Sequence, residues 1–78
     1  MLKWDGSKLK ELRRKRNWTQ KEVGMFVGKG PNYIGNYENG YADPPADTLL
    51  TLMSLFQCSF QDVSKCVETN YNQTEKSA

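Results

Sequence analysis

The chain has 78 residues, which is enough for one domain and too few for two. Hydrophobic residues make up 37% of it, a share that favours a folded chain over a disordered one. No apolar run approaches the roughly 18 residues of a membrane span, and the first residues carry no signal-peptide pattern. We therefore expect a cytoplasmic protein that makes no contact with a membrane.

The two cysteines, Cys58 and Cys66, are too few for a disulfide framework, so we expect reduced thiols. The chain has no histidine and no CxxC pair, which argues against a metal site. It also has no phosphate-binding glycine loop and no nucleophile–base pair. We therefore expect no cofactor, no catalytic residue and no enzyme activity.

The small net charge of +2 conceals an uneven distribution. Residues 1–30 hold nine Lys/Arg and three Asp/Glu, a charge of +6, whereas residues 31–78 hold two and six, a charge of −4. A basic half of a chain attracts phosphate even when the whole chain is nearly neutral. The alternative is that these charges simply form the solvated face of a helix.

The apolar spacing predicts short helices in chain order. Ser7 is the expected cap of the first helix, and Asn17 its stop. The pair Thr19 and Glu22 is typical of a capping box that starts a second helix, which two glycines end. Pro31 suits the first turn of a third helix, which ends at Asn39–Gly40.

The second half of the chain predicts two further helices after a proline-containing loop. One begins at Asp47 or Thr48 and carries several leucines, and Ser59 caps a short last helix that contains Val63 and Cys66. No alternation of strand type is apparent. We predict an all-α bundle of five short helices over residues 1–67, followed by a polar, flexible tail over residues 68–78.

The spacing within the second and third helices indicates a helix-turn-helix. Counting Gln20 as position one, a small residue falls at position five (Gly24), glycine at nine (Gly28) and a β-branched residue at fifteen (Ile34). The helices cross closely at the fifth position, the turn needs a positive φ at the ninth, and the fifteenth fills the angle between the helices. A generic helical hairpin with a glycine turn is the alternative.

With these positions, the chain resembles the lambda-repressor-like, Cro-type (XRE) helix-turn-helix family from about Ser7 to Val67. The resemblance rests on Trp18-Thr19-Gln20, Glu22, Gly28, Ile34, Tyr37-Glu38-Asn39-Gly40, Pro44 and Thr48-Leu49-Leu50-Thr51-Leu52. It implies a five-helix bundle that binds a two-fold DNA operator as a dimer and regulates transcription, as a repressor more often than as an activator.

The resemblance also assigns roles by position. The third helix would enter the major groove and contact bases. Phosphate contacts would come from the start of the second helix, from the turn and from the end of the third helix. Base contacts are expected from Pro31, Asn32, Tyr33 and Asn36, and phosphate contacts from Thr19, Gln20, Lys29, Asn39 and Gly40.

Two further features follow from the family pattern. Arg13 and Glu38 occupy positions that pair in several relatives, so we expect a structural ion pair. The pattern suggests Pro44, Phe56, Cys58 and Phe60 for the dimer surface, although the two phenylalanines would equally complete the core.

Three differences from the family motivate a second hypothesis of function beside the leading one. Pro31 stands where relatives often have a polar residue, Gly35 lies inside the third helix, and no Lys or Arg directly follows Gly40. The leading hypothesis is a sequence-specific DNA-binding regulator. The second is a protein-interaction module or antitoxin-like adaptor that reuses the same fold.

Overall fold

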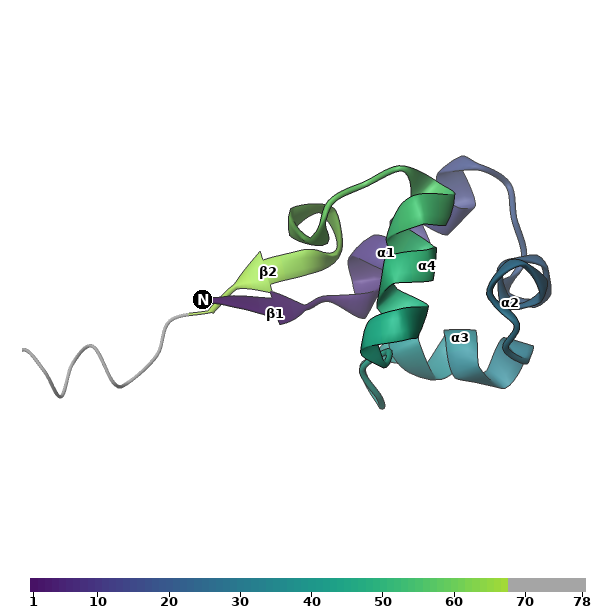
Figure 1. Cartoon of the computed structure of the whole chain (residues 1–78), viewed down its shortest axis with the longest axis horizontal. Helices are drawn as coiled ribbons and strands as arrows, with labels where there is room; N and C mark the ends of the chain where they lie inside the picture. Colours follow the sequence, from purple (N-terminus) through teal and green to yellow (C-terminus); the bar gives the residue numbers. More distant parts are fainter. Residues whose placement is uncertain (68–78) are drawn as a thin grey trace, which may run out of the picture.

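The computed structural model of the chain describes residues 1–67, so the polar segment predicted over residues 68–78 lies outside the described residues. The described part is mostly helical (Figure 1), with four α-helices, one 3-10 helix and two short strands. In chain order these are β1 (Leu2–Trp4), α1 (Gly6–Lys15), α2 (Gln20–Val27), α3 (Pro31–Asn39), α4 (Ala46–Phe56), η1 (Phe60–Val63) and β2 (Ser64–Cys66).

The predicted fifth helix is wrong: the fold is mostly helical, as expected, but it has four α-helices and an unpredicted two-stranded ribbon. The Ser59–Asp62 capping box forms, but it starts only the single 3-10 helix η1. The chain then extends as β2 and pairs antiparallel with β1. The backbone N–H of Asp5 donates to the carbonyl of Val63 at 2.8 Å, so the last described residues close onto the first ones and no further helical turn follows within the described part.

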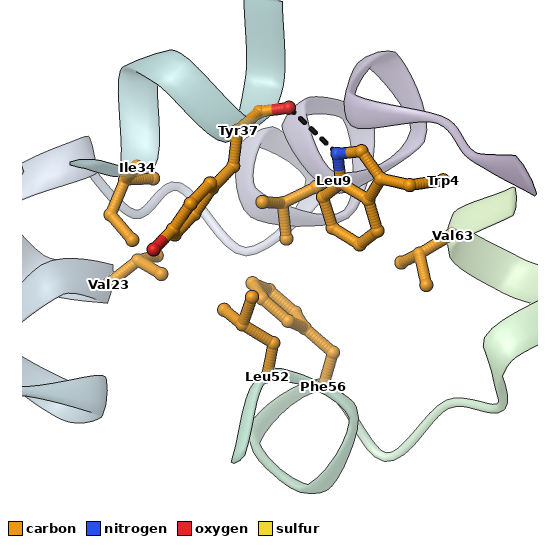
Figure 2. Packing of buried hydrophobic residues seen from close by; sticks show 8 residues of the cluster. All are labelled: Trp4, Leu9, Val23, Ile34, Tyr37, Leu52, Phe56 and Val63. Atoms are coloured by element: carbon orange, nitrogen blue, oxygen red, sulfur yellow. Dashed lines mark hydrogen bonds between the residues drawn. The ribbon is translucent and has the colours of Figure 1, made fainter. Parts of the chain in front are cut away.

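The hydrophobic core lies where the helices and the two-stranded ribbon meet (Figure 2). Trp4 of β1 takes part in it, and its indole Nε1 donates to the backbone carbonyl of Tyr37 at 2.9 Å. A buried indole N–H needs such a partner, and this one fixes β1 to the last turn of α3. The core consists of Trp4, Leu9, Val23, Ile34, Tyr37, Leu52, Phe56 and Val63.

The first helix begins one residue after its cap, Asp5, and not at the predicted cap Ser7. The carboxylate of Asp5 accepts from the backbone N–H of Ser7 at 3.1 Å and from its hydroxyl at 2.6 Å. These bonds stabilise the ionised form and lower the pKa of Asp5. Behind the cap, Gly6 is buried, and a Cβ atom there would overlap the carbonyl oxygen of Tyr37. Glycine therefore lets α1 start against the end of α3.

Two helices end at non-glycine residues in the left-handed conformation. Asn17, predicted as the stop of the first helix, follows α1 with φ 58°, and Gln57 caps α4 with φ 53°. The latter conformation costs roughly 1–2 kcal/mol for a residue with a Cβ atom. Gln57 is exposed, so its side chain is not needed for packing.

Replacing Gln57 with glycine should therefore stabilise the fold. We expect Gln57→Gly to raise the free energy of unfolding by about 0.5–1 kcal/mol, because relief of the backbone strain exceeds the entropy cost of glycine in the unfolded chain. Urea denaturation measures the change. The control is Ser54→Gly, at an exposed position inside α4, which should lose about 0.5–1 kcal/mol. Equal losses in both variants would show that the strain is absent.

Candidate nucleic-acid interface

The second helix begins as the sequence predicts, in a reciprocal capping box. The backbone N–H of Glu22 donates to Thr19 Oγ1 at 3.0 Å, and the backbone N–H of Thr19 donates to Glu22 Oε1 at 2.9 Å. Both residues are exposed, so the first turn of α2 faces solvent. The remaining free N–H groups of that turn carry the positive end of the helix dipole.

The turn between α2 and α3 also follows the predicted spacing. Gly28 is left-handed with φ 73°, and the N–H of Lys29 donates to the carbonyl of Gly24 at 2.8 Å. A Cβ atom on Gly24 would overlap the carbonyl oxygen of Lys29, so the small residue is required there. Ile34 is fully buried between the two helices. These interactions fix the angle at which α3 leaves the turn.

A buried ion pair joins α1 to α3. Arg13 Nε lies 2.6 Å from Glu38 Oε2, and Arg13 Nη2 donates to Glu38 Oε1 at 3.1 Å. A third guanidinium nitrogen, Nη1, donates to the carbonyl of Trp18 at 2.8 Å. Gln20 of α2 adds a bond from its Nε2 to Glu38 Oε1 at 3.1 Å. Three helices and one connecting segment therefore share one polar centre.

The predicted base-contacting residues are all exposed on α3. Asn32 and Asn36 lie one helical turn apart and are exposed, together with Pro31 and Tyr33. The opposite side of the helix is buried through Ile34 and other residues of the core. Thus α3 presents a polar, uncharged face to solvent and packs its apolar face inward.

The residues predicted to contact phosphate lie at two ends of the helix pair. At the start of α2, Thr19 is exposed, whereas Gln20 is half-buried with its amide bonded to Glu38. At the other end, Asn39 and Gly40 are exposed where α3 stops, with Gly40 left-handed at φ 80°.

Lys29, the remaining predicted phosphate contact, lies in the turn between the two helices. Its Nζ is 5.5 Å from the centre of the Tyr33 ring, within range of a cation–π interaction. This contact holds the only cation of the turn beside the first turn of α3.

Several cations of the basic first half make internal contacts. Lys8 Nζ donates to the carbonyl of Ser64. Arg16 donates to the carbonyls of Leu55 and Phe56, at 3.3 and 3.0 Å, and its guanidinium stacks 5.3 Å from the centre of the Trp18 ring. The Arg16 bonds satisfy carbonyls at the end of α4 and the Lys8 bond satisfies one in β2, so both cations have structural roles.

The residues suggested for a dimer surface separate into two groups. Phe56 belongs to the core, with 3% of its surface exposed, so it offers nothing to a second chain. Pro44 and Phe60 are half-buried and line an apolar hollow of about 540 Å³ together with Leu2 of β1. Cys58 is half-buried as well, and burial raises the pKa of its thiol.

The described residues also bear on metal binding, thiol pairing and membrane insertion. Residues 1–67 contain no cluster of three or more potential metal ligands, and both cysteines are free thiols. Within the same range, no helix is long and apolar enough to cross a membrane.

Two short helices joined by a glycine turn, with the second helix exposing polar side chains, define a helix-turn-helix unit. Residues 9–63 match the helix-turn-helix family model (HTH_3), and the chain belongs to this family. The match includes all of α2, α3 and α4 and most of α1.

Curated relatives carry names of transcriptional regulators. The chain is 42% identical over 71 residues to the HTH-type transcriptional regulator ImmR of Bacillus subtilis (strain 168), covering 83% of this chain and 56% of that protein. It is 31% identical over 71 residues to the cryptic phage CTXphi transcriptional repressor RstR of Vibrio cholerae, covering 91% and 64%. The chain thus spans less than two thirds of the length of either relative.

Two solved structures share the fold. The P22 c2 repressor in complex with synthetic operator 9T superposes with a TM-score of 0.73 at 26% identity, over 78% of this chain and 92% of that one. The restriction-modification controller protein C.AhdI from Aeromonas hydrophila has a TM-score of 0.68 at 22% identity, over 74% and 88%. The second likeness concerns the fold alone.

The buried ion pair gives a direct test of what sets the position of α3. Glu38→Gln leaves the Arg13 guanidinium buried without its counter-charge, and we expect it to lower the free energy of unfolding by about 3 kcal/mol. Urea denaturation followed by circular dichroism measures the loss. Glu11→Gln makes the same charge change at an exposed position of α1 and should cost no more than about 0.5 kcal/mol. Similar effects of the two variants would mean that the pair contributes little.

Proposed function

We propose that the chain binds double-stranded DNA sequence-specifically and regulates transcription in the cytoplasm, as a repressor rather than an activator. The observation that carries the proposal is the exposed asparagine face of α3, on a helix held by the turn and by the buried Arg13–Glu38 pair. Membership of the helix-turn-helix family and the names of its relatives, a phage repressor among them, support it.

In this proposal α3 lies in the major groove and contacts base edges. Asn32 and Asn36 each offer an amide that can pair with N6 and N7 of adenine, a contact that discriminates by roughly 1–3 kcal/mol. Pro31 has no donor and offers an apolar contact to a thymine methyl group, and Tyr33 lies beside it. The side-chain chemistry therefore favours half-sites that contain A·T pairs.

The backbone of the DNA would be bound at both ends of the helix pair. Thr19 and Gln20 place the first turn of α2 against one phosphate, where free N–H groups favour an anion. Lys29 supplies a cation at the turn, and Asn39 and the Gly40 amide contact a phosphate where α3 ends. Such contacts set the position of the protein on the duplex and carry no base information themselves.

We further propose that two copies bind a two-fold operator. The apolar hollow next to β1 would bring Leu2, Pro44 and Phe60 of the two copies together, with Cys58 nearby. Half-sites of such an operator would be separated by about one helical turn of DNA, or a multiple of it.

Base recognition can be tested by selecting bound duplexes from a random library and then measuring the affinity of variants for the selected site. Asn32→Ala and Asn36→Ala should each weaken binding to that site by about 5- to 100-fold. Both side chains are exposed, so the melting temperature and the affinity for random duplex should stay unchanged. Gln61→Ala, at an exposed position on η1, is the matched control for loss of an amide.

The same selection separates the two hypotheses of function. If no duplex sequence is enriched, and binding to random DNA is equally weak for all variants, the regulator proposal fails. An adaptor would instead bind its protein partner independently of Asn32 and Asn36.

Dimer formation can be tested by sedimentation velocity over a range of protein concentration. We expect the wild-type chain to self-associate, and Leu2→Gln to remain monomeric at the same concentrations, because Leu2 is 43% exposed and lines the hollow. Leu50→Gln removes an equally large side chain that is 63% exposed on α4 and should leave the association unchanged. Equal weakening by both variants would place the interface elsewhere.

A further inference from the structure

The segment from Gly30 to Ser64 contains no lysine and no arginine. It includes all of α3 and α4, and therefore the whole length of the helix proposed to enter the groove. Where α3 ends, the chain itself offers only Asn39, the Gly40 amide and the acidic residue Asp43. Any cation near this end must come from a part of the chain that is distant in sequence.

The two-stranded ribbon brings two such cations. Lys3 of β1 and Lys65 of β2 are direct partners in the antiparallel register, and both are exposed. Figure 1 shows the ribbon leaving the bundle on the side where α3 ends. Lys3 and Lys65 line the same polar hollow of about 310 Å³ as Asn39 and Gly40.

The ribbon is fixed to this end of α3. Trp4, the neighbour of Lys3, donates its indole N–H to the carbonyl of Tyr37, in the last turn of the helix. Gly6 packs against the same carbonyl. The positions of the two lysines relative to Asn39 are therefore set by buried contacts.

Two ammonium groups directly opposite each other on neighbouring strands repel and destabilise the ribbon. Within residues 1–67 neither lysine has a carboxylate within 4.0 Å, since the ion pair found there joins Arg13 and Glu38. Three acidic residues, Asp5, Glu38 and Asp43, also line the hollow. Asp5 is bonded to Ser7, with Lys65 near enough to help lower its pKa, and Glu38 is paired with Arg13. An anion placed between the lysines would relieve the repulsion.

We propose that Lys3 and Lys65 together bind a phosphate of the DNA backbone, next to the phosphate contacted by Asn39 and Gly40. This inference rests on the proposed function and adds a second, ribbon-borne contact to it. A backbone phosphate fits better than a free anion because the hollow is open and continuous with the exposed end of α3. The contact supplies positive charge where the segment after α3 has none.

The test uses fluorescence anisotropy with two labelled 30-bp duplexes, one carrying the selected site and one of random sequence, at several salt concentrations. Lys3→Gln and Lys65→Gln should each weaken binding to both duplexes by about three- to tenfold at low salt. Each should also reduce the slope of log affinity against log salt by about one. The melting temperature should stay the same or rise, because a like-charge pair is removed.

Two variants serve as controls. Lys15→Gln removes an exposed lysine at the end of α1, which Figure 1 shows on the far side of the bundle from α3, and should change neither affinity nor slope. Lys3→Arg keeps the charge and should bind like the wild type.

The outcomes separate this site from the proposed function. If the wild type binds the selected duplex and Asn32→Ala weakens it, while both lysine variants keep the wild-type affinity and salt slope, the ribbon site is rejected and the regulator stands. Melting of the variants well below the wild type would also reject the site, since the lysines would then be stabilising the fold. If the wild type binds neither duplex, both proposals fail together.

Discussion

The guanidinium of Arg13 is the point on which the arrangement of the first three helices depends. It reaches Glu38 of α3 through two bonds and the carbonyl of Trp18, before α2, through a third, while Gln20 of α2 bonds to the same carboxylate. Both charged groups have lost most of their water, with side-chain exposures of 11% and 1%. Such a pair is favourable only when its geometry is satisfied almost completely. Any tilt of α3 would break several of these bonds at once, so the geometry of the helix pair is held narrowly.

A second set of contacts holds the last turn of α3. The indole of Trp4 bonds to the carbonyl of Tyr37, and Gly6 allows α1 to begin directly against it. The same strand, β1, is joined to β2 at the end of the described chain. The exposed asparagine face is thus positioned by charge pairing and by the ribbon, and neither set of contacts uses a residue of that face.

Local patterns were sufficient to predict the helix-turn-helix, because each of its requirements is satisfied within a few residues. The capping box at Thr19, the left-handed Gly28 and the buried Ile34 all follow from short-range sequence. The ribbon could not be predicted in the same way. Its strands have three residues each, too few for an alternating pattern, and its register depends on contacts about 60 residues apart in sequence. Gly6 likewise gives no signal until α3 is in place.

The prediction of a fifth helix was wrong for a related reason. The Ser59–Asp62 box is a genuine start signal, but a capping box stabilises only the first turn and says nothing about the length that follows. The residues after it are needed to cover Trp4, so Val63 is buried and Ser64 pairs with Trp4 across the ribbon. Tertiary burial of one aromatic side chain outweighed a local preference for helix.

The charge counted along the sequence differs from the charge that the folded protein offers to a ligand. The first thirty residues carry a charge of +6. Three of their cations, however, donate hydrogen bonds within the protein: Arg13 to a carboxylate, and Lys8 and Arg16 to backbone carbonyls. A count of basic residues therefore overstates the charge that a phosphate would meet. Conversely, β2 belongs to the acidic half of the chain, and folding carries its lysine, Lys65, to a position opposite Lys3 beside the end of α3. Electrostatic attraction to a polyanion depends on where the cations lie and on whether they are already paired. Here the pairing of β1 with β2 determines the position of two cations, and the order of residues along the chain does not reveal it.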